Sequence, residues 1–269
     1  ERRSVMSSAL GVDSTCEWAP EDYHTHNVVM VPLKIQIDDQ TLLDQVELTS
    51  EEFYDRMEAS AGIPMTSQPS PGDFIEVYNR LAEEAEMAAK SVSVPVAVID
   101  SKNASSSLGL LAGKACAMRD AGETFEAIVG AVRSDTAKTH LFIAPESTDN
   151  LVKGGRLSEE QAQGAAMLNI KLVFTLDCDG RLVAFDKVKG SKGVIKKFVE
   201  TAATYAEEYG TLAIRIMHAR NQGEVDKLVD ALREEKIDFE LIGIDACGAT
   251  VATHTGIGVI GLAIMPAKG

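Results

Sequence analysis

Short apolar runs alternate with amphipathic stretches along the first half of the chain. The apolar runs predict buried strands at 8–12, 28–37 and 94–99. The amphipathic stretches predict helices at 13–26, 51–58, 71 onwards and 108–120. Strands that alternate with helices indicate an α/β fold, with a parallel sheet covered by helices. We therefore expect a Rossmann-like N-terminal domain over residues 1–147.

The second half of the chain has a different pattern. Residues 169–176 and 181–188 predict two strands of a hairpin, joined by a turn at Asp179-Gly180. Further helices are expected at 193–208 and 222–235, and further strands at 212–217, near Leu241 and at the C-terminus. Hairpins mixed with helices predict an α+β domain with a mainly antiparallel sheet over residues 148–269. The boundary falls in a connection rich in Pro, Ser, Thr and Asn at 145–150.

A glycine-rich stretch near the C-terminus carries one histidine. Gly256, Gly258 and Gly261 match the spacing of a dinucleotide-binding loop, but that loop must be followed by a helix and an acidic residue about 20 positions later. Here the chain continues into an apolar strand and ends after eight more residues. We interpret the stretch as a turn that presents His254 before the final strand.

Hydroxyl-rich loops follow three of the predicted N-terminal elements, at 13–15, 65–73 and 100–107. Ser70 is a plausible helix cap, with Pro71 at the first helical position and Asp73 two residues later. Turn chemistry alone explains any one of these loops. Three of them at strand ends favour a ligand site, since free N–H groups at helix starts bind anions.

Basic residues occur in two further places. Lys153-Gly154-Gly155-Arg156 precedes a capping-box pattern formed by Ser158 and Gln161, which would hold Arg156 near a helix start. That arginine either faces a carboxylate or phosphate or lies exposed on a turn. A lysine cluster at 187–197 is either a solvated helix face or a surface for an acidic partner.

Composition excludes several classes of function. The net charge of −15 argues against nucleic-acid binding, because phosphate contacts need an excess of Lys and Arg. No apolar run approaches the ~20 residues of a membrane span. The four cysteines are scattered, and we find no metal motif, P-loop or nucleophile elbow. We expect a cytoplasmic protein without a metal or a cofactor.

Ten segments of the chain, taken together and in order, resemble the DegV family of bacterial fatty-acid-binding proteins. The most specific are Thr-Ser-Gln-Pro-Ser at 66–70, Lys-Gly-Gly-Arg at 153–156 and Thr-His-Thr-Gly at 253–256. The others lie at 12–15, 31–33, 53–54, 98–101, 168–171, 179–180 and 187–189. The resemblance covers most of the chain.

The resemblance implies a lipid carrier rather than an enzyme. In this family a long-chain fatty acid lies in an apolar tunnel between two domains and is passed to a separate fatty acid kinase, which makes an acyl phosphate. By position, Thr66 and His254 correspond to the carboxylate ligands, and Arg156 and Lys189 to basic residues near the head group. Ser67, Ser14 and Thr253, in the same loops, are expected around it.

The chain departs from the family pattern at several positions. Lys189 stands where the family commonly has Arg, Ile257 where it usually has Pro, and Leu172 where it often has Pro. Near residue 85 the family has a further strand and a loop that supplies a head-group serine, whereas residues 80–89 continue as one helical pattern. We expect a break within 82–87, where such a segment would be missing from the ordered chain.

Two alternatives to the carrier remain open. A hydrolase or phosphotransferase could use Ser67 or Ser14 as a nucleophile with His254 as its base, although no acidic residue is recognisable that would orient the histidine. A structural or regulatory protein with a vestigial pocket becomes more plausible if the serine-bearing segment is truly deleted.

Overall fold

The computed structural model describes residues 8–60, 62–89 and 95–267. Its largest sheet has six strands in the order β10-β9-β11-β6-β7-β8, in which only β10 and β9 run parallel. The strands are β6 (His140–Ala144), β7 (Ile170–Leu176), β8 (Leu182–Lys189), β9 (Leu212–His218), β10 (Phe239–Ala246) and β11 (Ile260–Pro266). The predicted hairpin is confirmed as β7 and β8, whose turn uses Gly180 at a φ of +76°.

Two small sheets form the N-terminal part of the structure. The first pairs β1 (Leu10–Asp13) with β2 (Val28–Val31) in parallel. In the second, β3 (Lys34–Ile37) pairs antiparallel with both β4 (Gln40–Leu43) and β5 (Met65–Ser67). The predicted single strand at 28–37 is therefore two strands, separated at Pro32, which has no N–H to donate to a ladder. Residues 95–99 form no strand, contrary to prediction, and residue 94 lies outside the described residues.

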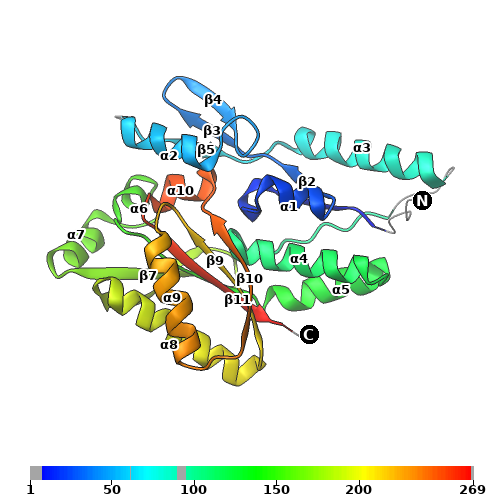
Figure 1. The fold of residues 1–269 in the computed structure, drawn as a ribbon. Helices are drawn as coiled ribbons and strands as arrows, with labels where there is room; N and C mark the ends of the chain where they lie inside the picture. The colour runs from blue at the N-terminus through cyan, green and yellow to red at the C-terminus, as the bar shows by residue number, and fades with distance from the viewer. Residues whose placement is uncertain (1–7, 61, 90–94, 268–269) are drawn as a thin grey trace.

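Helices cover both faces of the six-stranded sheet (Figure 1). On one face lie α8 (Gly190–Tyr209) and α9 (Gln222–Glu234). The N-terminal helices are α1 (Pro20–Thr25), α2 (Ser50–Ala59), α3 (Pro71–Ala89), α4 (Ser106–Asp120) and α5 (Phe125–Thr136), after a single 3₁₀ turn at Ser14–Cys16. Three short helices also occur in the part of the chain that the structure describes: α6 (Asp149–Lys153), α7 (Glu159–Met167) and α10 (Ala249–Thr255).

Side chains cap two helix starts as predicted. The hydroxyl of Ser70 accepts the N–H of Asp73, whose carboxylate accepts the N–H of Ser70. The hydroxyl of Ser158 accepts the N–H of Gln161, which closes the expected capping box with its own side chain. These caps fix the starts of α3 and α7.

One apolar core joins the two halves of the chain. Ile35 and Phe53 pack with Met217 and Ala263 of the large sheet in a single buried cluster. Tyr54 donates a 2.5 Å hydrogen bond to the carbonyl of Cys247. The expected division of the chain at residue 147 remains a prediction; β6, which precedes it, pairs with strands that follow it.

Helix α3 runs without interruption from Pro71 to Ala89. The expectation of a break within 82–87 is therefore wrong. The 3.6-residue pattern of apolar positions is sustained through this stretch, so the backbone can continue as one helix without another strand.

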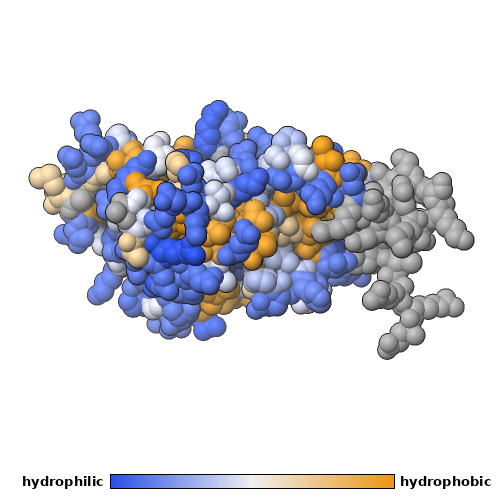
Figure 2. All heavy atoms as spheres, turned by 90° about the horizontal axis from the view of Figure 1, so that it is seen from above, coloured by the Kyte–Doolittle hydropathy of each residue, from blue (hydrophilic) through white to orange (hydrophobic). Residues whose placement is uncertain are grey.

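Most of the face seen from above is hydrophilic, with hydrophobic patches along its middle (Figure 2). No helix within the described ranges is both long and apolar enough to span a bilayer.

Candidate functional site

Thr66 and His254 meet at the junction between β5 and α10. The pairing of Ile35 with Thr66 fixes β5 against β3, and His254 lies in the last turn of α10. The hydroxyl of Thr66 lies 3.3 Å from Nε2 of His254. His254 is thus presented by a helix, not by the turn predicted from sequence. That turn follows directly, at Gly256 with a φ of +79°.

The Lys-Gly-Gly-Arg segment packs beside the same histidine. A Cβ at Gly154 would lie 3.1 Å from Nδ1 of His254 and 3.0 Å from the carbonyl of Asn150, so only glycine fits without displacement. Asn150 donates a 2.9 Å hydrogen bond to the carbonyl of Thr253, which ties α6 to α10. Arg156 folds back and donates to the carbonyl of Gly154. Arg156 is exposed on this turn, which is the second of the two alternatives that the sequence left open.

His254 is neutral at pH 7. Burial, together with a smaller effect of the positive charge of Arg156, lowers its pKa to about 4. Its Nδ1 is buried and has no hydrogen-bond partner among the described residues. A neutral imidazole keeps one N–H, so His254 can donate one hydrogen bond to a ligand and accept one other.

Two buried carboxyl groups hold the start of α10. Glu17 accepts a 2.8 Å hydrogen bond from the N–H of Gly248, and Asp44 accepts a 2.5 Å hydrogen bond from the hydroxyl of Thr250. The helix has no side-chain cap of its own at Gly248. Carboxyl oxygens at a helix start accept hydrogen bonds from groups that have no partner within the helix. Both residues therefore position the helix that carries His254.

Sequence inspection missed Glu17 and Asp44, because neither belongs to a motif. Burial raises the pKa of Glu17 to about 8 and raises that of Asp44 above its ordinary value. The hydrogen bonds from Ser105 to Glu17 and from Ser14 and Thr250 to Asp44 oppose these shifts. A buried carboxyl is costly unless its oxygens are hydrogen-bonded, which accounts for the hydroxyls around each.

Several hydroxyls predicted near the ligand already have protein partners. Ser14 donates to Asp44 at 2.9 Å and accepts from the N–H of Leu33 at 3.1 Å. The hydroxyl of Thr253 donates to the carbonyl of Ala249, within its own helix. Ser67 is exposed at the end of β5. Their roles around a head group remain predictions; among the predicted hydroxyls, that of Thr66 contacts His254.

The third hydroxyl-rich loop is also structural. Ser105, Ser106 and Ser107 are fully buried. Their hydroxyls donate to the side chain of Glu17, to that of Asp245 at 2.7 Å and to the carbonyl of Ala104 at 2.7 Å. The hydroxyls at the start of α4 are therefore engaged by protein acceptors.

Lys189 and Arg156 have different surroundings. It ends β8 and lines a hollow together with Lys192, Glu224 and Lys227. In the rest of the lysine cluster, Lys197 pairs with Asp186 at 2.7 Å and Lys196 with Glu200 at 3.6 Å. Arg156 is the basic residue that acts on His254, and a head-group role for Lys189 remains a prediction.

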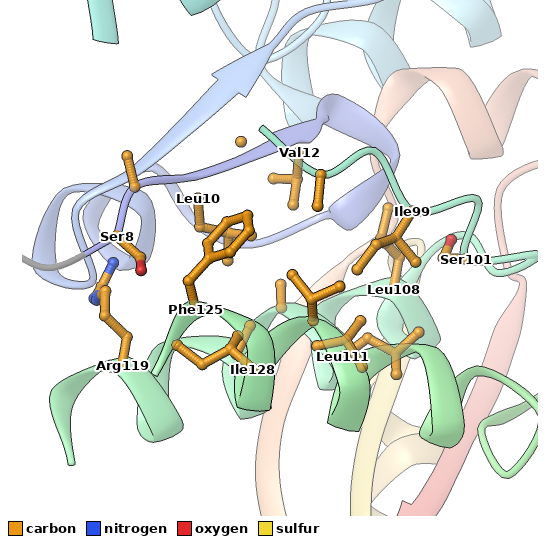
Figure 3. A pocket seen from close by; sticks show the side chains of 17 residues that line it. Ser8, Leu10, Val12, Ile99, Ser101, Leu108, Leu111, Arg119, Phe125 and Ile128 are labelled. Carbon is orange, nitrogen blue, oxygen red and sulfur yellow. The ribbon is translucent and has the colours of Figure 1, made fainter. Parts of the chain in front are cut away.

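An apolar cavity of about 160 Å³ lies between β1, α4, α5 and residues 97–101. Leu10, Val12, Ile99, Leu111 and Phe125 point into it, and Ser8 and Arg119 lie together at one end (Figure 3). A dry cavity of roughly 150 Å³ accommodates a benzene-sized ligand. This cavity is therefore suited to a segment of a hydrocarbon chain.

Within the residues that the structure describes, neither Ser14 nor Ser67 is hydrogen-bonded to His254. The side-chain contact of His254 is with Thr66, and Ser14 donates to a carboxylate rather than to an imidazole. No group of three His, Cys, Asp or Glu residues there is arranged to hold a metal ion. An activated serine would need its base within hydrogen-bond reach.

Comparisons with known proteins bear on the family and the fold of this chain. A family model described as "Uncharacterised protein, DegV family" matches residues 8–86 and 82–267, two segments that overlap at 82–86 within α3. A fatty-acid-binding DegV family protein from Thermus thermophilus is similar in structure, with a TM-score of 0.85, 25% identity and coverage of 96% of this chain and 99% of that one. One from Streptococcus agalactiae, also described as fatty-acid-binding, has a TM-score of 0.82 and 27% identity, covering 97% and 99%.

A third solved structure was determined with a ligand in place. It is a DegV family protein from Eubacterium eligens loaded with heptadecanoic acid, with a TM-score of 0.78, 25% identity and coverage of 96% of this chain and 99% of that one. Because the family model matches nearly the whole of the described sequence, this chain belongs to the DegV family.

Proposed function

We propose that this protein binds a long-chain fatty acid, with the carboxylate at Thr66 and His254 and the acyl chain among the apolar side chains between the two halves of the molecule. The contact between Thr66 and His254 carries the proposal. The fatty-acid ligands of similar proteins support it.

The geometry suits one carboxylate oxygen between two donors. The Thr66 oxygen and His254 Nε2 are 3.3 Å apart. An oxygen about 2.8 Å from each, an ordinary hydrogen-bond length, fits beside that pair. The hydroxyl and the imidazole N–H would both donate, and the nearby charge of Arg156 would favour the anion.

Apolar burial would supply most of the affinity. Each buried methylene contributes about 0.8 kcal/mol. The cavity lined by β1, α4 and α5 lies within the N-terminal half and would take the end of the chain, on the order of six carbons by comparison with benzene-sized cavities. The remaining methylenes would lie between that cavity and the head group.

The finer role that we propose is that of a carrier in the cytoplasm. The protein would present its bound acid to a separate fatty acid kinase, which forms the acyl phosphate. Carrying needs no nucleophile and no base, and the engaged hydroxyl of Ser14 supports this over a hydrolase. The uninterrupted α3 replaces the family segment that supplies a head-group serine, so Thr66 and His254 would bear more of the binding.

The decisive test is to identify what the purified protein holds. Lipid extracted from the protein and analysed by mass spectrometry should contain a long-chain fatty acid at close to one molecule per chain. Incubation with ATP alone should yield no acyl phosphate. The proposal would be refuted if the purified protein contained no lipid and also failed to bind a fluorescent fatty acid.

A further inference from the structure

A groove of about 910 Å³ lies between α1, α4 and the edge strand β10, and Thr66 and His254 are not among its lining residues. Leu110 and Met118 of α4 form part of one wall, and Ala213 and Met265 belong to the strands beside it. Ile242 and Ile244 of β10 line it and remain 46% and 43% exposed. Exposed apolar residues that gather along one groove mark an interaction site.

The edge of the sheet is open along this groove. Among the described strands, β10 pairs with β9 and with no other. Ile242 is the extra residue of a bulge, after which 243–246 resume regular pairing beside the groove. A regular edge segment offers its outward N–H and C=O groups to another strand.

The two edges of the sheet differ in charge. The outer edge of β8 carries Lys187 and Lys189, and lysines on an edge discourage further pairing. The exposed charged residue of β10 is Glu240, since Asp245 is buried and paired with Arg215. A basic strand would be repelled at β8 and attracted at β10.

Uncompensated acidic side chains outnumber free cations in the lining of the groove. Asp22, Glu123 and Glu240 line it and form no ion pair among the described residues. Glu17 is buried with a raised pKa, Arg215 and Asp245 neutralise each other at 2.5 Å, and Lys114 binds Asp135. The groove therefore presents an excess of negative charge to an occupant.

We propose that this groove docks an extended, basic and apolar segment of a partner protein, which adds a strand to β10 at 243–246. Backbone hydrogen bonds to the edge would give affinity, apolar side chains would cover Ile242 and Ile244, and Lys or Arg would face the acidic rim. A second copy of this chain would bring the same acidic groove and net charge of −15, so like charges oppose self-pairing.

The test uses a labelled ten-residue peptide of alternating Lys and Ile, at concentrations where it does not self-associate. Its matched controls are an alternating Glu–Ile peptide and a Lys–Ile peptide N-methylated at every second amide. Anisotropy titrations compare the wild-type protein with Ile244→Lys and with Val183→Lys, a similarly exposed apolar residue on β8. Hydrogen exchange follows the amides of β10 and β8, and thermal melts establish that both variants fold.

The Lys–Ile peptide should bind wild type and Val183→Lys equally, and Ile244→Lys at least tenfold more weakly. Binding should weaken with salt, and exchange should slow at 243–246 and not in β8. Equal binding of the Glu–Ile or N-methylated peptide, undiminished binding to Ile244→Lys, or no binding to wild type would overturn the proposal. So would a wild-type dimer in sedimentation that Ile244→Lys dissociates, because the occupant would then be a second copy. Should Ile244→Lys not fold, the exchange pattern and the control peptides decide alone.

Discussion

The imidazole Nε2 of His254 lies 3.3 Å from the hydroxyl of Thr66, although 188 positions separate the two residues in sequence. One belongs to a short edge strand and the other to the end of a short helix. Their meeting depends on the tertiary packing of α10 against the N-terminal elements.

Removing either donor should weaken fatty-acid binding. Thr66→Val and His254→Ala should each cost about 1–3 kcal/mol, because a buried carboxylate oxygen loses a partner. This corresponds to roughly 5- to 150-fold in Kd. Displacement of a fluorescent fatty acid measures the change, and Thr41→Val, at an exposed position of neighbouring β4, serves as the control. Unchanged affinity in both site variants would argue against the assigned roles.

Fatty-acid binding should raise the pKa of His254. In the free protein, burial and the charge of Arg156 hold that pKa at about 4. A carboxylate placed beside the ring stabilises the imidazolium and so shifts the pKa upward. Imidazole resonances titrated by NMR, with and without the ligand, should show the rise. The substitution His24→Gln removes one other histidine, so the same titration of that variant aids assignment. An identical His254 pKa in the free and the fatty-acid-bound protein would place the carboxylate elsewhere.

Local chemistry explains which elements could be predicted from sequence. The caps at Ser70 and Ser158 and the hairpin turn at Gly180 each rest on residues within a few positions of one another. Helix α10 was missed because its sequence, Ala-Thr-Val-Ala-Thr-His-Thr, contains several weak helix formers. Its start is stabilised by carboxyl groups that are distant in the chain.

The same limit applies to the candidate site. Thr66, His254 and Arg156 were chosen from three separate segments, and the structure brings them together. Ser14 is also expected near the head group from sequence, although less directly than Thr66 and His254, because a hydroxyl after a strand is typical of ligand loops. Its partner Asp44 lies 30 positions away and has no sequence signature, so its structural use could not be foreseen.

Ser14 should matter for stability more than for ligand binding. Ser14→Ala leaves the buried Asp44 with one fewer donor and should lower the free energy of unfolding by about 1–3 kcal/mol. Chemical denaturation measures this loss, and Ser67→Ala, at an exposed position, should change stability little. Fatty-acid affinity of the folded Ser14→Ala protein should stay within about twofold. That is a change of roughly 0.4 kcal/mol in binding free energy, on the scale where 1.4 kcal/mol is tenfold. A large loss of affinity with unchanged stability would instead place Ser14 at the head group.

Glu17 should make the protein less stable as the pH rises. Its pKa is about 8 in the folded protein and ordinarily 4.5, so between these values the folded state holds a proton that the unfolded state has released. Stability attributable to this residue is fully present below about 4.5 and is lost as the pH rises through about 8, with a slope of up to about 1.4 kcal/mol per pH unit.

Glu17→Gln removes the titration while keeping acceptors for Gly248 and Ser105. Denaturation curves collected from pH 5 to pH 8 should therefore show a smaller decline in stability for Glu17→Gln than for the wild type. Glu21→Gln, at an exposed position in the first turn of α1, supplies the matched control and should keep the wild-type slope. If both variants decline in parallel with the wild type, the carboxyl of Glu17 is ionised in the folded protein and holds α10 as an anion.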